Sequence, residues 1–119
     1  MGRRRACASR PVRGASLIFR RRFADVIRRQ LDLFEREQRG LIEDCLAAER
    51  AYNRSDRDEA EERYGDYVDL VETGTEVLAD LRDTFARTLD DETAEEYEAA
   101  FNRAVIKRLP RFALEIENR

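Results

Sequence analysis

Apolar residues recur at steps of three and four positions along most of the chain, a periodicity typical of amphipathic helices that pack lengthwise. In the first stretch this pattern runs from about Leu17 to Tyr52 and keeps its phase across Gly40. We therefore predict one long helix over 17–52, with Gly40 as the site of any bend. Its stripe consists of Phe23, Ile27, Leu31, Phe34, Leu41, Cys45, Ala48 and Tyr52.

The second stretch carries the most regular pattern. The polar segment 53–56 offers Ser55 or Asp56 as a helix N-cap, and the apolar steps that follow predict a helix over 57–89. Gly74 lies on the stripe, where glycine costs about 1 kcal/mol relative to alanine. We therefore expect a close backbone approach or a slight kink there. The stripe consists of Ala60, Tyr64, Tyr67, Val71, Gly74, Leu78, Leu81 and Phe85.

A shorter third helix is predicted over 92–109. Asp90, Asp91 or Thr93 can cap its start. Pro110 ends or kinks this helix, because proline lacks the backbone N–H and clashes with the preceding turn. A short amphipathic helical tail follows, with Phe112, Leu114 and Ile116.

These lengths predict an all-α fold, in which 17–52 and 57–89 form a long antiparallel hairpin. The third helix starts where the second ends, so we expect it to pack on the base of the hairpin and to leave the other end uncovered. That end should be a projecting two-helix tip around Cys45, Ala48, Tyr52, Ala60, Tyr64 and Tyr67.

The start of the chain differs sharply in charge from the rest. Residues 1–22 hold eight Arg and no acid, whereas 23–119 hold 15 basic and 26 acidic residues. We expect 1–16 to be a disordered or untranslated leader, followed by a single helical domain over 17–119. Three origins stay open: GC-rich upstream sequence read from too early a start, which we favour, an organelle transit peptide, or a basic arm for nucleic acid or an acidic membrane.

The amino-acid composition excludes most kinds of catalytic site. The chain has no His, so it lacks the commonest general base and metal ligand, and its two Cys cannot form a four-ligand zinc site. Its acid clusters lie at helix starts, where the helix dipole favours them. We predict no enzymatic activity, no cofactor and no metal site. No apolar run approaches the roughly 20 residues of a membrane span, and two Cys fit a reducing cytoplasmic setting.

Two groups of side chains are candidates for binding. Tyrosines and apolar residues near thinly covered surface are candidate contacts for a partner, because Tyr is enriched at interface hot spots. They are Tyr52, Tyr64, Tyr67, Phe112 and Ile116. The second group shares one helical side if the third helix continues through Pro110, and is a candidate anion site: Arg103, Lys107, Arg108 and Arg111.

We therefore expect a small cytoplasmic helical module for protein–protein interaction, acting as a homodimer or binding another protein. The alternative is a basic-arm binder of nucleic acid or anionic membrane through residues 1–22. That alternative requires the Arg-rich segment to belong to the protein, and the acidic body would repel such a surface.

Overall fold

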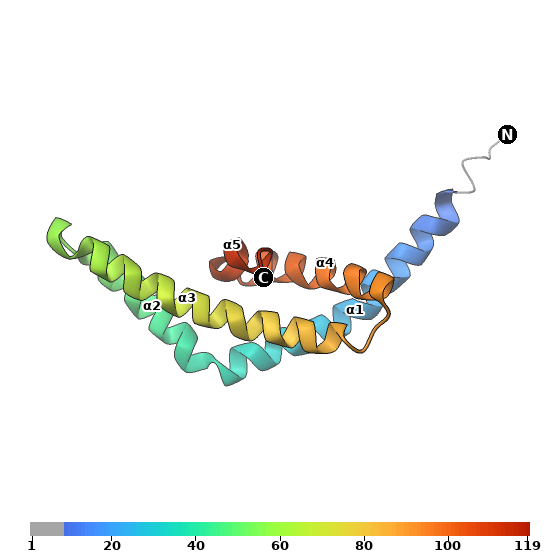
Figure 1. Cartoon of the computed structure of the whole chain (residues 1–119), viewed down its shortest axis with the longest axis horizontal. Coiled ribbons are helices and arrows are strands. Elements are labelled where there is room, and N and C mark those ends of the chain that lie inside the picture. The colour runs from blue at the N-terminus through green and yellow to red at the C-terminus, as the bar shows by residue number, and fades with distance from the viewer. Residues whose placement is uncertain (1–8) are drawn as a thin grey trace.

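The computed structural model describes residues 9–119, with side chains from Phe23 onward (Figure 1). Over these residues the chain is all-α, as predicted, and contains no strand. The helices are α1 (Ser9–Glu37), α2 (Arg39–Arg54), α3 (Arg57–Ala86), α4 (Asp91–Arg108) and α5 (Ala113–Ile116), with a 3-10 turn η2 (Pro110–Phe112) before α5.

α1 begins earlier than the expected start at Leu17 and so reaches into the segment 1–16 that we expected to be a leader. Arg10, Arg13 and Ala15 are good helix formers, and Pro11 lies in the first turn, where proline is tolerated. Residues 1–8 lie outside the described part of the chain.

The stretch predicted as one helix over 17–52 consists of two helices that meet at Gln38 (Figure 1). Gln38 has φ −107° and ψ 27°, away from α-helical values. The N–H groups of Gln38 and Ile42 still donate to the carbonyls of Phe34 and Gln38, at 2.8 and 2.9 Å. The break is therefore a sharp bend rather than a loop. It lies at Gln38, two residues before Gly40, so the prediction of one continuous helix was wrong, because the backbone leaves α-helical geometry there.

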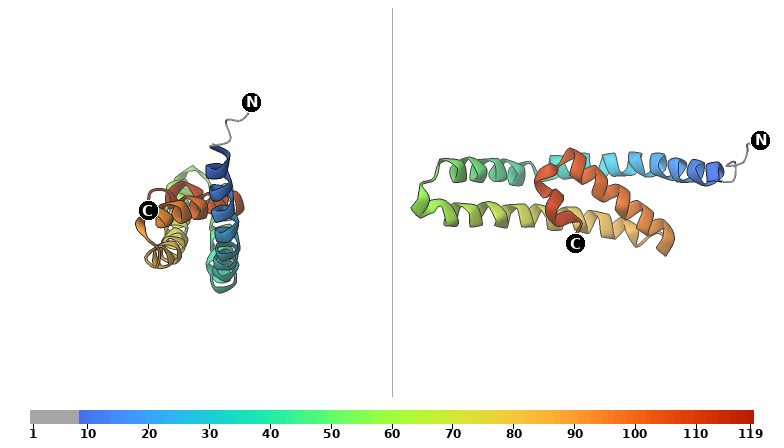
Figure 2. Two further views of the ribbon diagram at one scale, coloured as in Figure 1. Left: turned by 90° about the vertical axis from the view of Figure 1, so that its right-hand side faces the viewer. Right: turned by 90° about the horizontal axis from the view of Figure 1, so that it is seen from above.

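α2 and α3 lie side by side, whereas α1 diverges from α3 beyond the bend (Figures 1 and 2). α4 crosses from the end of α3 to α1, and η2 and α5 return to α3 (Figure 2). α4 and the tail thus fill the angle between α1 and α3. The core residues there include Phe23, Ile27, Leu31, Phe34, Leu78, Tyr97, Phe101, Val105, Phe112 and Ile116.

Two aspartates start the helices after the turns. The carboxylate of Asp56 accepts a hydrogen bond from the Glu59 N–H at 3.1 Å, and that of Asp90 accepts one from the Thr93 N–H at 2.8 Å. Among the alternatives left open by the sequence, these two are the N-caps. The bond from Thr93 also lowers the pKa of Asp90, because it stabilises the charged carboxylate.

Tyr97 is the centre of an aromatic cluster in the core. It is fully buried, and its ring centroid lies 5.5 Å from Phe23, 4.8 Å from Phe85 and 6.0 Å from Phe101. Its hydroxyl donates to Gln30 Oε1 at 2.8 Å, so the one polar atom of the ring is satisfied. Burial raises the pKa of Tyr97 to about 12.

Gly74 lets the tail approach α3 closely, and a close approach is one of the two roles that the sequence suggested for this glycine. A Cβ atom added there would lie 2.4 Å from Phe112 Cε1 and 2.9 Å from Phe112 Cζ. The Phe112 ring also packs edge-on against Phe34, with centroids 5.6 Å apart. One side chain of η2 therefore contacts both α1 and α3 at the point where these helices begin to diverge.

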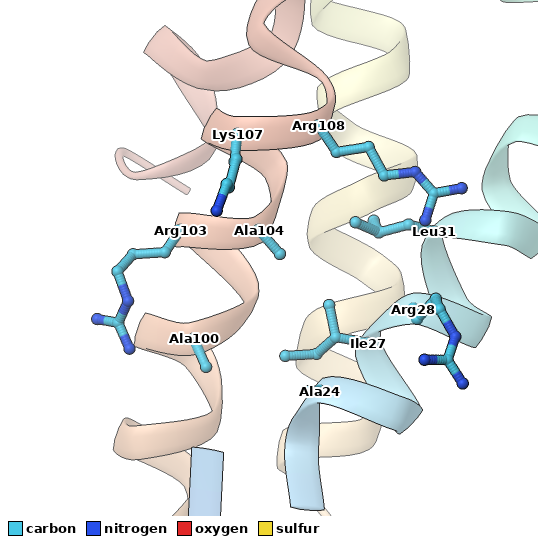
Figure 3. Close-up of a pocket in the computed structure, with 9 residues that line it drawn as sticks. All are labelled: Ala24, Ile27, Arg28, Leu31, Ala100, Arg103, Ala104, Lys107 and Arg108. Atoms are coloured by element: carbon cyan, nitrogen blue, oxygen red, sulfur yellow. The ribbon is translucent and has the colours of Figure 1, made fainter. Parts of the chain in front are cut away.

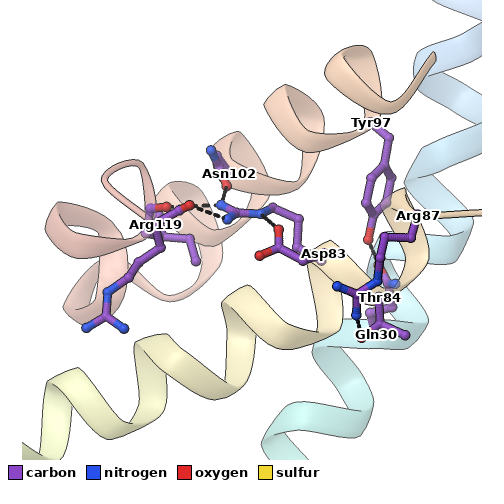
Figure 4. A network of polar contacts seen from close by, with 9 residues as sticks. Gln30, Asp83, Thr84, Arg87, Tyr97, Asn102 and Arg119 are labelled. Carbon is purple, nitrogen blue, oxygen red and sulfur yellow. Dashed lines mark hydrogen bonds and ion pairs between the residues drawn. The ribbon is translucent and has the colours of Figure 1, made fainter. Parts of the chain in front are cut away.

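A buried arginine holds the end of the tail, and its partners Asp83, Asn102 and Arg119 are labelled in Figure 4. Arg82 is 4% exposed, and its guanidinium donates to the side chains of Asp83 and Asn102, at 2.8 and 2.9 Å. It also donates to the backbone oxygens of Ile116 and Arg119, at 3.0 and 2.7 Å. A buried guanidinium requires such partners, so this network fixes where α5 ends on α3.

We predict that Gly74→Ala destabilises the protein and that Gly65→Ala does not. Overpacking a core costs about 1–3 kcal/mol, which exceeds the gain of up to about 1 kcal/mol from replacing a helical glycine. Gly65 lies in the same helix with no atom within 4 Å of an added Cβ, so only the gain applies there. Urea unfolding measures the stability of both variants. When Gly74→Ala is combined with Phe112→Ala, the penalty at position 74 should disappear.

A second prediction concerns alkaline stability. Because the pKa of Tyr97 is raised from 10.0 to about 12 by burial, the unfolded chain loses this proton first. The stability that this shift contributes is complete below pH 10 and is lost as the pH rises through 12. In Tyr97→Phe the free energy of unfolding should therefore fall less steeply over this range than in the wild type. The exposed Tyr52→Phe is the control, and equal slopes in all three proteins would contradict the prediction.

Candidate functional site

A groove runs between α1 and α4, with a volume of about 350 Å³ (Figure 3). It exists because α4 meets α1 through small side chains. Ala100 and Ala104 point from α4 toward Ile27 and Leu31 on α1, and Ala24 lies at the same side of α1. We call it the α1/α4 groove. Its lining residues are Ala24, Ile27, Arg28, Leu31, Ala100, Arg103, Ala104, Lys107 and Arg108.

The floor of the α1/α4 groove is apolar. Ile27 and Leu31 are buried core residues that form its bottom, whereas Ala100 and Ala104 are half-buried. Because alanine fills little space, the surface above these positions is hollow. A surface of this kind suits a ridge of side chains from another helix.

The charged residues of the groove are all cations, and they differ in their ion pairs. Arg108 donates to Asp32 and to Glu35, at 2.5 Å each, and these two carboxylates raise its pKa. Arg28 forms an exposed pair with Asp25 at 3.1 Å. Within residues 23–119, neither Arg103 nor Lys107 forms an ion pair, and both are exposed.

Three of the four predicted anion-site residues thus line one groove, and the fourth does not. Arg111 instead donates to the Tyr67 hydroxyl at 3.2 Å and pairs with Glu49 at 3.4 Å. Its guanidinium also lies 5.8 Å from the centroid of the Tyr67 ring. The prediction was wrong for Arg111, because α4 ends at Arg108 and Pro110 turns the chain away from that side.

The residues predicted to contact a partner also fall into groups, which differ in how exposed their side chains are. Tyr52 and Tyr64, 39% and 53% exposed, lie near the end of α2 and the start of α3 with ring centroids 5.4 Å apart. Tyr67 is half-buried against Arg111. Phe112 and Ile116 are buried in the core and cannot serve as a surface, so that expectation is corrected.

The tail was misjudged because the sequence does not show which surface the tail packs against, although Gly74 indicates a close approach on the second helix. The pattern shows an amphipathic segment without showing what its apolar side meets. The structure supplies Gly74 and Arg82 on α3 as the receiving surface, and the exposed apolar residue of the tail is Leu114. For the α1/α4 groove a weak signal exists in the alanines of α4, which recur at a helical step beside a long apolar stripe.

A second hollow, of about 480 Å³, lies between α1 and α3. It follows from the same divergence of the two helices, and it leaves Leu81 and Phe85 only partly covered. It contains a single charged residue, so charge indicates no partner for it. Its lining residues are Gln30, Val77, Asp80, Leu81, Thr84, Phe85 and Thr88.

Residues 9–119 contain no group of three or more His, Cys, Asp or Glu side chains placed to hold a metal ion. None of the helices in this part of the chain combines the length and the apolar character that crossing a membrane requires. The alternative site in residues 1–22 concerns side chains outside the described part of the structure.

No protein-family model, no curated protein and no solved structure matches this chain. The assignment of a function therefore depends on the geometry of the groove and on the charges around it.

We predict that Arg108 and Arg103 differ in their effect on stability. Arg108→Gln removes two contacts between α4 and α1 and should lower the free energy of unfolding by roughly 0.2–1 kcal/mol, the range of exposed ion pairs. Arg103→Gln, on the same helix, should leave it unchanged because no ion pair is lost. Chemical unfolding of both variants checks this, and equal effects would show that the contacts of Arg108 do not stabilise the fold.

Proposed function

We propose that this protein is a helical interaction module that binds a helix of a partner protein in the α1/α4 groove. The observation that carries the proposal is an apolar hollow between two helices that no helix among residues 23–119 covers. The polar members of this surface are cations and its floor is aliphatic, which supports binding of an apolar, acidic ligand there.

The shape of the groove favours a helix as the occupant. Two packed helices present a channel whose floor follows the step of three and four residues, and a third helix can lay one stripe of side chains into it. The alanines at positions 100 and 104 permit a close approach, because they leave space for side chains of the partner. A partner helix would thus complete packing that α1 and α4 leave open.

We further propose that the module acts in the cytoplasm. Cys45 is a free, buried thiol whose pKa is raised by burial, and unpaired cysteines are the rule in reducing compartments. This part of the proposal supports a partner from the same compartment.

The test uses a designed helical peptide with a leucine stripe flanked by Gln, and follows the backbone amides of the protein by NMR. We expect shifts confined to the residues around Ala24–Leu31 and Ala100–Arg108. Ala100→Gln should weaken binding at least roughly tenfold, since it fills the floor of the groove. Ala99→Gln, on the exposed side of the same helix, is the matched control and should bind as the wild type does.

Shifts that are absent, or that fall elsewhere, would overturn the proposal. So would equal binding by the two alanine variants. Circular dichroism on each variant verifies that the helices are retained, so that a loss of binding reports on the groove and not on the fold.

A further inference from the structure

The α1/α4 groove has a charge opposite to that of the molecule around it. Residues 23–119 hold 15 basic and 26 acidic residues, yet the four charged residues that line the groove are all cations. A cluster of cations on an otherwise acidic protein creates a local positive potential, and this potential favours a partner that carries negative charge.

Three of these cations are available to a partner. Arg108 is already held by Asp32 and Glu35, and its main effect is to tie α4 to α1. Arg103 and Lys107 form no ion pair within residues 23–119, and the exposed pair of Arg28 with Asp25 is of a kind that contributes little to stability. A partner's carboxylates therefore displace only one weak, exposed ion pair at these three cations.

The cations stand on both sides of the apolar floor (Figure 3). Arg103 and Lys107 flank the groove on the α4 side, one helical turn apart, and Arg28 flanks it on the α1 side. We propose that the occupant is an amphipathic helix whose apolar stripe is bordered by acidic residues on both flanks. This inference rests on the proposed function, and it adds the chemical identity of the partner.

A membrane surface and a nucleic acid fit these observations less well. The apolar side chains lie at the bottom of a concave surface, whereas a helix that binds a lipid surface presents its apolar face outward. Nucleic-acid backbones are bound by cations and polar groups, and an aliphatic floor offers them no contact. An acidic amphipathic helix uses both the floor and the rim.

The experiment measures the binding of three helical peptides to the full-length chain, and all three peptides carry the same leucine stripe. One carries Glu on both flanks of the stripe, one is its isomer with the same residues but with Glu on the outer face and Gln on the flanks, and one carries Lys on the flanks. We expect the Glu-flanked peptide to bind at least roughly tenfold more tightly than its isomer. The Lys-flanked peptide should bind most weakly, and the advantage of the Glu flanks should shrink as salt is added.

A second experiment reverses the charge of groove residues in the protein. Arg103→Glu with Lys107→Glu should abolish the preference for Glu flanks. Arg50→Glu with Arg54→Glu is the matched control, because these exposed residues have the same spacing near the end of another helix and the same change in net charge. The control should keep the preference. The peptide comparison on the wild-type protein stands even if a reversed variant fails to fold.

The outcomes separate the two proposals. If the Gln-flanked peptide used above binds in the groove but the Glu-flanked peptide gains nothing, this inference fails and the interaction module stands. If no peptide binds, both fail. Shifts at the same amides caused by phosphatidylserine vesicles or duplex DNA, and not by the Glu-flanked peptide, would overturn this inference in favour of those partners. A dimer whose interface covers the groove would assign it to a second copy and would also overturn it.

Discussion

The divergence of α1 from α3 beyond Gln38 exposes apolar surface on both helices, and the rest of the structure is arranged to cover it. α4 crosses between them, and the aromatic cluster around Tyr97 fills the space that opens. A straight hairpin would have paired α1 with α3 directly and would have left α4 little to bury. The coverage of α1 is incomplete in two places. The hollow between α1 and α3 follows from the bend, and the α1/α4 groove follows from the small side chains through which α4 meets α1.

The tail closes the vertex of the angle. Phe112 contacts Gly74 and Phe34 together, so it fixes the distance between α3 and α1 close to the bend. Arg82 then satisfies backbone oxygens at the end of α5, which would otherwise lack partners beside an apolar core. A charged side chain is thus used inside the fold to specify where a short helix ends, since packing alone would allow it to slide along α3.

The sequence was sufficient for those features that depend on neighbours along the chain. Periodicity indicated the helical stretches, cap candidates that include Asp56 and Asp90 preceded α3 and α4, and Gly74 pointed to a close approach or a kink. The errors concern a bend within one periodic stretch and contacts between distant segments. No local signal distinguishes a bend at Gln38 from a continuous helix, because the apolar phase is kept across it. Likewise, Phe112 and Ile116 form an apolar tail in the sequence whether they face the core or a partner.

The pairing of Gly74 with Phe112 has an evolutionary consequence. The two positions share one volume, so a side chain at the first can be accommodated only if the ring at the second becomes smaller. Substitution at either position alone would leave a clash or a cavity next to the bend. In the descendants of this chain these two positions, far apart in sequence, should therefore change together.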